Sequence, residues 1–267
     1  MKKSLYALLE GLIDYAGLFP PAALSMQDAV RNYARYREGE YAFALGRFVV
    51  PKERAKEVPP EFPLSILGVD EVKATSEEEI AELARASTCH AEPVEASPES
   101  GDPSTALGMT PFVEIADLGL LDAIAKHGLR AKIRTGGITP DAFPAIGSVA
   151  DFLRACKEKG VAFKATAGLH HPLRCLKPLT YEPNAPVGTM HGFLNVFLAA
   201  AFVEHADAIL TETDANAFAF DDEAASWRGH HISVQNIEEM RKTFAISFGS
   251  CSFEEPIGDL RDLGFLT

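Results

Sequence analysis

The sequence predicts an α/β protein folded as a single (β/α)8 barrel of the TIM type. Three observations support this fold class. The chain has 267 residues, a length that suits one barrel. Short apolar segments alternate with stretches of helical periodicity, which favours parallel strands joined by helices. No G-x-G-x-x-G motif follows the first expected strand, which disfavours the alternative of an open, doubly wound sheet.

Eight short segments have the apolar composition of barrel strands. Most are separated by helical segments, for which Ser25 supplies a typical start and Gly160 a typical end. Only the link after the second strand is short. The expected strands are 12–16, 42–50, 63–68, 112–115, 131–134, the opening of 161–174, 208–212 and 245–250, and the expected helices are 25–37, 76–86, 118–127, 148–159, 191–205 and 254–262.

Residues 88–110 differ in kind from the rest of the chain. They are rich in Pro, Ser, Gly and Glu and have no apolar periodicity, which predicts a disordered insertion. The segment resembles the translated form of short repetitive elements that are scattered through bacterial genomes. We therefore expect one barrel domain over 1–267 with an insertion at 88–110, and no catalytic role for His90.

Charge and cysteine content exclude several classes of protein. A net charge of −13 disfavours binding to nucleic acid or to an anionic membrane, although local Arg and Lys can still bind a small anion. The 4 cysteines form no C-x-x-C pair, which disfavours a cysteine zinc site and a disulfide scaffold. No apolar run reaches the roughly 18 residues of a membrane span, and the first residues do not read as a signal peptide. These features predict a cytoplasmic protein.

Nearly every expected strand ends in a polar or charged side chain. The active site of a barrel lies at the carboxyl ends of its strands, and a purely structural barrel would bring mainly Val, Ile and Leu to that end. This concentration of polar residues is the strongest functional signal in the chain. The residues concerned are Asp14, Arg47, Glu114, Lys132, Arg134, Lys164, Thr166, His170, Glu212, Ser250 and Cys251.

Lys132 and Arg134 are two residues apart, so both side chains lie on one side of their strand. We expect Arg134 to bind a carboxylate or phosphate beside Lys132, with help from the backbone amides of Gly136 and Gly137. The alternative is that this side of the strand faces solvent or an acidic helix.

Three other residues are candidates for substrate binding. Arg47 either binds the same anion or forms a salt bridge with Asp14 or Glu114. Thr166 stands between two small residues near the end of its strand. Ser250 leaves the eighth expected strand, a place where barrels commonly bind phosphate.

Proton transfer is the role expected of Glu114, and His170 is a further catalytic candidate. Glu114 is one residue from the end of an apolar strand, where burial would raise its pKa; the alternative is a structural partner of a neighbouring cation. His170 and His171 are adjacent, so on an extended backbone they point in opposite directions and at most one enters the site. Cys251 has no obvious His or Asp partner in the sequence, which favours a buried structural thiol.

The segment 164–168 reads K-A-T-A-G and resembles the strand of deoxyribose-phosphate aldolases that carries the Schiff-base lysine. The resemblance implies that Lys164 attacks a carbonyl group and that burial and nearby cations, Lys132 or Arg134, lower its pKa. A wider set of motifs resembles an uncharacterised family of bacterial barrel proteins, which implies the fold and no activity. These motifs are D-Y-A-G-L-F-P-P-A, K-I-R-T-G-G, F-K-A-T-A-G-L-H-H-P, M-H-G-F-L-N and F-G-S-C-S-F-E-E-P.

The leading hypothesis is an aldolase or lyase that acts on a small anionic carbonyl compound through a Schiff base on Lys164. One alternative is a metal-dependent lyase or hydrolase, with Glu114, His191 and either His170 or His171 as ligands. Another is a barrel that binds a ligand without converting it.

Few partners are expected beyond this small anionic substrate. No H-x-H or H-E-x-x-H spacing supports a metal site, and the leading hypothesis requires no cofactor. Residues 193–203 are hydrophobic almost all round. They predict a helix that is either covered by neighbouring helices or forms the interface of a homo-oligomer.

Overall fold

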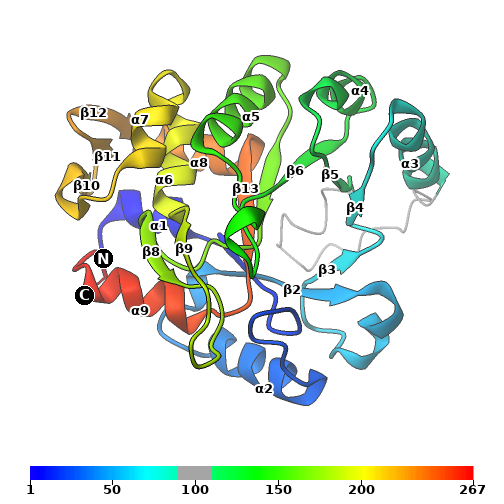
Figure 1. Ribbon diagram of the computed structural model, residues 1–267, viewed down its shortest axis with the longest axis horizontal. Coiled ribbons are helices and arrows are strands. Elements are labelled where there is room, and N and C mark those ends of the chain that lie inside the picture. Colours follow the sequence, from blue (N-terminus) through cyan, green and yellow to red (C-terminus); the bar gives the residue numbers. More distant parts are fainter. Residues whose placement is uncertain (90–109, 267) are drawn as a thin grey trace, which may run out of the picture.

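Eight parallel strands close into a barrel in the computed structural model, which describes residues 1–89 and 110–266 (Figure 1). This confirms the predicted (β/α)8 barrel of TIM type. Around the barrel the strands follow the order of the chain, and the last strand closes against the first. The strands are β1 (Ile13–Tyr15), β2 (Leu45–Pro51), β3 (Leu64–Leu67), β4 (Glu71–Lys73), β5 (Phe112–Glu114), β6 (Arg130–Arg134), β7 (Phe163–Thr166) and β13 (Ala245–Ser250).

Helices surround the strands and are bounded by local signals. Ser25 accepts a hydrogen bond from the backbone N–H of Asp28 at the start of α2. Gly160 has a φ of 64° and ends α5 in the left-handed conformation that glycine tolerates. The helices of the barrel wall and its ends are α1 (Lys3–Leu9), α2 (Met26–Arg37), η1 (Ala42–Ala44), η2 (Lys52–Glu57), α3 (Glu77–Cys89), η3 (Leu118–Leu120), α4 (Leu121–Lys126), η4 (Pro140–Ala142), α5 (Ile146–Lys159), α8 (Val234–Thr243) and α9 (Glu254–Asp262).

The expected strand at 208–212 is wrong, because most of these residues lie in helix α7 (Ala206–Thr211). The buried residues of this helix are Ala206, Ile209 and Leu210, a helical spacing. A short apolar run alone does not distinguish a strand from a short buried helix.

The barrel instead includes β4, which was not predicted. Glu71 and Lys73 give this strand a charged sequence, and both side chains point towards the other strands, where they form ion pairs. A turn at 68–70 joins β3 to β4 without a helix between them. Gly68 takes a φ of 86° in this turn, a conformation that favours glycine.

The long connection from β7 to β13 carries most of the additional structure. Helix α6 is buried over Phe193–Ala200, so its apolar surface is covered by other parts of the same chain. Of the two alternatives for the apolar helix, the structure therefore supports coverage by neighbouring elements. This connection contains the hairpin β8 (Cys175–Pro178) and β9 (Val187–Met190), α6 (Phe193–Ala201), η5 (Val203–His205), α7, η6 (Ala215–Ala217), and the sheet of β10 (Phe218–Phe220), β11 (Ala224–Trp227) and β12 (His230–Ser233).

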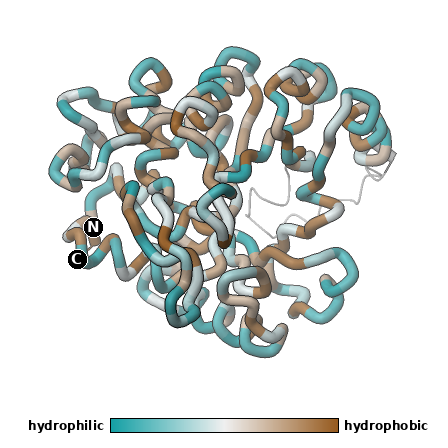
Figure 2. Tube along the Cα trace, in the orientation of Figure 1, coloured by the Kyte–Doolittle hydropathy of each residue, from teal (hydrophilic) through white to brown (hydrophobic). Residues whose placement is uncertain are grey.

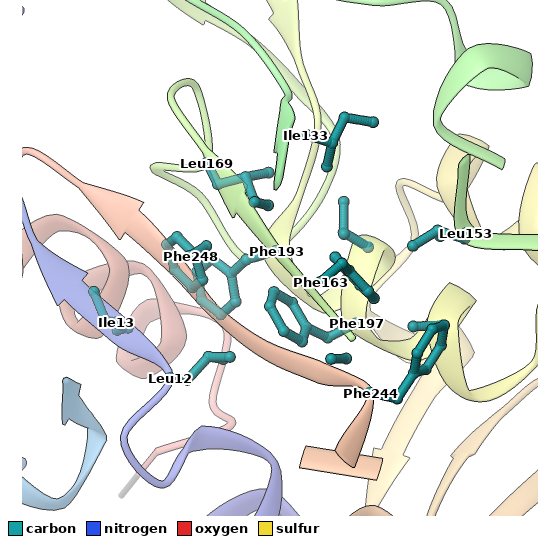
Figure 3. Packing of buried hydrophobic residues seen from close by; sticks show 14 of the residues in the cluster. Leu12, Ile13, Ile133, Leu153, Phe163, Leu169, Phe193, Phe197, Phe244 and Phe248 are labelled. Carbon is teal, nitrogen blue, oxygen red and sulfur yellow. The ribbon is translucent and has the colours of Figure 1, made fainter. Parts of the chain in front are cut away.

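The hydrophobic core lies between the barrel strands and the helices outside them. Figure 2 shows hydrophilic residues over much of the outer loops, and Figure 3 shows aromatic and aliphatic side chains packed beside β7 and β13. The ring of Phe163 lies 5.7 Å from that of Phe152 and 5.2 Å from that of Phe244. Phe248 stacks on Phe193, with ring centroids 5.1 Å apart. These contacts hold the outer face of the barrel wall.

Two further expectations concern the insertion at 88–110 and the absence of a membrane-spanning segment. Of the predicted insertion at 88–110, residues 90–109 lie outside the described residues; α3 precedes them and β5 follows them. Within the described ranges, every helix is too short or too polar to cross a membrane.

Candidate active site

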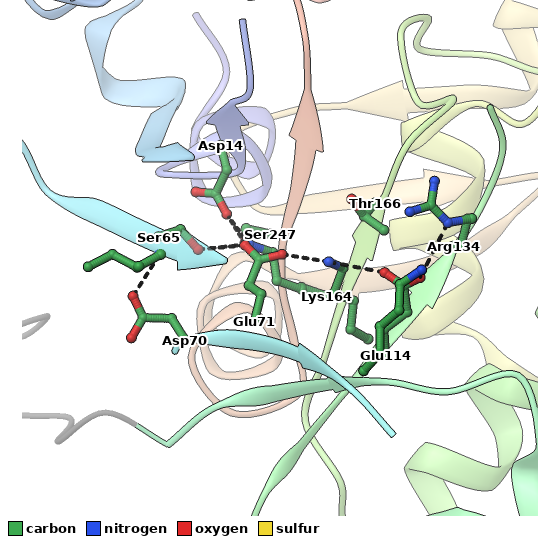
Figure 4. Close-up of polar contacts among 12 residues, drawn as sticks. Asp14, Ser65, Asp70, Glu71, Glu114, Arg134, Lys164, Thr166 and Ser247 are labelled. Carbon is green, nitrogen blue, oxygen red and sulfur yellow. Dashed lines mark hydrogen bonds and ion pairs between the residues drawn. The ribbon is translucent and has the colours of Figure 1, made fainter. Parts of the chain in front are cut away.

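Charged side chains from different barrel strands point into the barrel and lie in a row in which positive and negative groups alternate (Figure 4). Lys164 Nζ lies 2.7 Å from Asp14 Oδ2 and 2.5 Å from Glu71 Oε1. Lys132 Nζ lies 2.8 Å from Glu71 Oε2 and 3.1 Å from Glu114 Oε2, the latter a contact of charges without hydrogen-bond alignment. We call these residues the charge ladder: Asp14, Lys164, Glu71, Lys132 and Glu114.

The ladder runs from the closed interior of the barrel to its mouth. At the inner end, Asp14 accepts hydrogen bonds of 2.7 Å from the Arg47 backbone N–H and from Ser247 Oγ. At the other end, Glu114 Oε1 lies 3.3 Å from both Arg134 Nε and Lys73 Nζ. The exposed fraction of the side chain rises from 2% for Lys164 to 8% for Lys132 and 48% for Arg134.

Two members of the ladder, Lys164 and Glu114, depart from the expected pKa directions. Burial alone would lower the pKa of Lys164, but Asp14 and Glu71 outweigh it and raise the pKa above its ordinary value. Burial alone would raise the pKa of Glu114, but Lys132 and Arg134 hold it below its ordinary value. The expectations of a lowered Lys164 pKa and a raised Glu114 pKa are therefore wrong, because each group is surrounded by opposite charge.

Glu71 is the central rung and joins the two lysines. Burial opposes its ionisation, yet Lys164 and Lys132 together hold the pKa of Glu71 well below its ordinary value. Ser65 also donates a hydrogen bond of 2.5 Å to Glu71 Oε1. Glu71 therefore stays ionised between the two lysines.

A cavity of about 460 Å³ opens at the carboxyl ends of the strands, beside the charge ladder. This volume suits a small molecule. One wall is apolar and is formed largely by the segment after β1. The polar side chains that line the cavity are Glu71, Lys132, Arg134, Thr139, Thr166, His170 and Cys251, and the larger apolar ones are Phe19, Pro20, Pro21, Val49, Leu67 and Ile138.

The structure brings the predicted anion-binding residues together in one corner of this cavity. Lys132, Arg134, Gly136 and Gly137 all line it. In the parts of the chain that the structure describes, the backbone N–H groups of Gly136 and Gly137 donate to no other protein group. Two unused amides beside a guanidinium group form a suitable site for a carboxylate or phosphate. We call these four residues the anion corner.

The backbone around this corner is tightly packed. A Cβ atom at Gly168, which has a φ of 75°, would lie 2.7 Å from the Cα of Gly136. The preceding Ala167 also has a positive φ of 62°, unusual for a residue with a side chain. Thr135 Oγ1 donates a hydrogen bond of 2.6 Å to the Ala167 carbonyl and joins the two loops. The strained conformation therefore lies at the cavity wall.

Two predicted binding residues do not reach the cavity. Arg47 donates through its guanidinium group to the Leu64 carbonyl at 3.1 Å and borders a different cleft at the amino ends of β2 and β3. Ser250 is buried outside the cavity, because its neighbours Gly249 and Cys251 occupy the inward positions of the strand. Thr166, by contrast, lines the cavity as expected of a binding residue.

His170 enters the cavity and His171 does not. His170 Nδ1 lies 3.3 Å from Glu255 Oε2 and 3.8 Å from Cys251 Sγ. Burial opposes its charge, but the contacts with Cys251 and Glu255 raise the pKa of His170 to about 9. His171 Nδ1 instead lies 2.5 Å from Asp259 on α9. The expectation that only one of the two enters the site agrees with this geometry.

The ligands suggested for a metal site lie apart. His191 Nε2 contacts the Pro144 carbonyl at 2.9 Å, in a different cleft from the charge ladder. His171 pairs with Asp259, and Glu114 pairs with cations. Among residues 1–89 and 110–266, His, Cys, Asp and Glu form no group of three or more arranged to hold a metal ion.

Sequence reasoning missed Glu71 and the partner of Cys251. Glu71, Val72 and Lys73 alternate between charged and apolar residues, as the residues of a strand can. Charged side chains are rarely buried inside a sheet, so this segment has the appearance of a loop. Cys251 is buried as expected, and its partner His170 is 81 positions away. Glu212, another candidate, bonds to Arg228 and Trp227 and belongs to a separate structural contact.

Comparison with known proteins does not extend these findings. No protein-family model and no curated protein matches the chain. The fold and the site therefore rest on this structure, and the resemblances to aldolases and to a bacterial barrel family remain predictions from short motifs.

Proposed function

We propose that this protein is an enzyme of the aldolase or lyase type that converts a small anionic carbonyl compound through a Schiff base on a lysine. One observation carries the proposal. The amine of Lys132 borders the cavity between two carboxylates, next to Arg134 and the free amides of the anion corner. A nucleophilic amine and an anion site on one cavity are the two elements that this chemistry requires.

Lys132 is better placed for the attack than Lys164. Lys164 does not line the cavity, and Asp14 and Glu71 hold it as an ammonium ion. Lys132 lines the cavity and shares Glu71 with Lys164. We therefore assign the Schiff base to Lys132 and give Lys164 the role of fixing Glu71, a positioning residue that keeps this carboxylate ionised.

The proposed reaction begins with loss of one proton from the Lys132 amine to solvent in the cavity, because Glu71 is held ionised and is a poor proton acceptor. The free amine adds to the carbonyl carbon, the C=O π pair moves to oxygen, and His170 supplies a proton to that oxygen. Loss of water leaves an iminium ion. His170, which gave up its proton in the addition step, accepts the proton of a β-hydroxyl group. The adjacent carbon–carbon bond then breaks, and its electron pair moves into the iminium group to give an enamine. Protonation of the enamine and hydrolysis release the second product and restore the lysine.

Arg134 would select the substrate. Its guanidinium group is half exposed at the cavity, so it can rearrange from Glu114 to an incoming carboxylate or phosphate. Glu114 would remain paired with Lys132 and Lys73 during this exchange. In this proposal, Glu114 holds the two cations in position and does not itself transfer the proton.

Borohydride trapping with mass spectrometry tests the proposal. Small aldehydes, ketones and keto acids are each incubated with the protein and reduced, and modified lysines are identified in peptides. We expect an adduct on Lys132 that is absent from Lys132→Arg, a variant that retains the positive charge between Glu71 and Glu114. Arg134→Gln should reduce trapping of keto acids about tenfold and leave trapping of uncharged aldehydes unchanged.

The other outcomes decide between the remaining hypotheses. An adduct on Lys164 would keep the Schiff base and overturn the assignment to Lys132. If no lysine is modified by any compound while anions still protect the protein against heat, the ligand-binding barrel becomes the better description.

A further inference from the structure

A second reactive group lies on the cavity wall formed by β13 and the segment after β7. Cys251 and His170 both line the cavity, although they come from different strands. The Sγ–Nδ1 distance of 3.8 Å is within hydrogen-bond range for sulfur. Neither residue belongs to the charge ladder or the anion corner. A thiol beside an imidazole is the arrangement that activates a cysteine.

The residues around this pair orient it. Glu255 on α9 lies 3.3 Å from His170 Nδ1 and provides a carboxylate partner for the imidazolium ion. Tyr181 also contacts the pair, with its hydroxyl 3.8 Å from Cys251 Sγ and 3.2 Å from Glu255 Oε2. The sulfur therefore has an imidazole nitrogen and a hydroxyl within reach, and the carboxylate that faces the same nitrogen stabilises the imidazolium ion.

We propose that Cys251, activated by His170, is a nucleophile that binds a small aldehyde in the cavity as a hemithioacetal. The proposed reactive form of the pair carries one proton. When this proton is on His170, the Cys251 sulfur attacks the aldehyde carbon, the Sγ–C bond forms and the C=O π bond breaks. The proton then passes from His170 to the new alkoxide, so nothing is oxidised or reduced and the addition is reversible.

The physical support for this step is independent of Lys132. The raised pKa of His170, about 9, favours the proton on the imidazole at neutral pH. The apolar wall of Phe19, Pro20 and Pro21 suits the carbon skeleton of an aldehyde. The biological role of the adduct rests on the proposed function, because cleavage of an aldol releases an aldehyde into this cavity beside the enamine on Lys132.

The other cysteines provide internal references. Cys175 is partly exposed, and burial raises its pKa to about 11. Cys156 is fully buried in α5, and burial raises its pKa to about 12. Neither has a histidine partner among the hydrogen bonds of the described residues. Exposure alone would make Cys175 the faster to react, whereas activation by His170 favours Cys251.

Labelling with iodoacetamide, followed by peptide mass spectrometry, tests the proposal. At pH 7 we expect Cys251 to react about tenfold faster than Cys175, and His170→Gln to slow Cys251 about tenfold without changing Cys175. The groups that face the pair and could shift its pH profile are Tyr15, Tyr181, Glu255 and His171. Equal or slower labelling of Cys251 in the folded wild-type protein would overturn the activation, and this comparison needs no variant.

A second experiment tests whether acetaldehyde protects Cys251 against labelling. Acetaldehyde should slow the labelling of Cys251 reversibly, whereas acetate at the same concentration should not. The protection should persist in Lys132→Arg, in which borohydride trapping at that position is lost. Protection that disappears with Lys132 would show that a Schiff base blocks the cavity and would overturn the hemithioacetal; rapid labelling without any protection would overturn it as well. Failure of lysine trapping alone would leave the result for Cys251 unaffected.

Discussion

The two faces of strand β7 carry opposite kinds of side chain. Phe163 faces outwards and packs against the rings of Phe152, Phe197 and Phe244. Its neighbour Lys164 faces inwards, where its amine contacts Asp14, Glu71 and the ring of Phe112. A step of one residue therefore separates the hydrophobic packing of the barrel from its charged interior. Since successive strand residues alternate in direction, the same chain segment serves both faces.

The difference shows which face is built for stability and which for chemistry. Burial of an aromatic side chain stabilises the folded state with no further requirement. Buried ion pairs must first be removed from water, and well-packed apolar residues of similar size often stabilise a protein as much or more. A ladder of five buried charges next to a cavity is therefore poorly explained by stability alone. Its presence supports a chemical role for the interior.

The largest effect should come from the outer face. Phe163→Ala removes a fully buried ring from the aromatic cluster, and we expect the free energy of unfolding to fall by about 4 kcal/mol. Denaturant unfolding followed by circular dichroism measures this loss. It should be nearly constant between roughly pH 5 and pH 9, because no side chain of the aromatic cluster titrates in that range. A strongly pH-dependent loss would contradict the separation of the two faces.

A smaller loss, with a pH dependence, should follow from the inner face. Lys164→Met leaves Asp14 and Glu71 buried without this cation, and we expect a loss of about 3 kcal/mol at neutral pH. The pKa of Glu71 is lowered in the folded protein, so its contribution is present above its ordinary value of 4.5 and disappears as the pH falls through the folded value. The pKa of Lys164 is raised, so its contribution is present below 10.5 and disappears as the pH rises through the folded value.

The difference between wild type and Lys164→Met should therefore be greatest between these limits and shrink in acid. Unfolding at a series of pH values down to roughly pH 3 measures it. Lys159→Met is the matched control, because this lysine pairs with the exposed Asp122 on the surface and its replacement should leave the free energy of unfolding close to that of the wild type at every pH. A loss for Lys164→Met that is as large in acid as at neutral pH would contradict the proposed ion pairing.

Most of the fold could be predicted because the outer faces of the strands leave a clear apolar pattern. The exceptions include β4 and α7, and α1, α8 and the strands β8 to β12 were not predicted either. In β4 the inward Glu71 is stabilised by lysines from strands that are distant in the sequence, so a local pattern cannot reveal its burial. In α7 a short apolar run fits two kinds of element, and packing against α5 and α6 determines which one forms.

The site was predictable only where residues close together in the sequence line the same side of the cavity. Lys132 and Arg134 lie on one side of β6, and Gly136 and Gly137 follow directly, so the anion corner could be inferred from local spacing. The charge on each group depends on which distant residue it faces. Lys164 was expected beside cations and instead faces carboxylates, since the barrel brings β1 and β4 across from β7.

The smallest predicted effect comes from a comparison of alanine substitutions at two glycines, one at the mouth of the barrel and one at the end of α5. Gly168 and Gly160 both have a positive φ, of 75° and 64°, so alanine should cost about 1 kcal/mol at either position. At Gly160 an added Cβ would meet nothing within 4 Å, whereas at Gly168 it would lie 2.7 Å from the Cα of Gly136. Gly168→Ala should therefore cost about 2 kcal/mol and also displace the anion corner, so that trapping of keto acids falls while Gly160→Ala traps them like the wild type. Equal unfolding free energies and equal trapping in the two variants would mean that the contact between Gly168 and Gly136 does not shape the cavity.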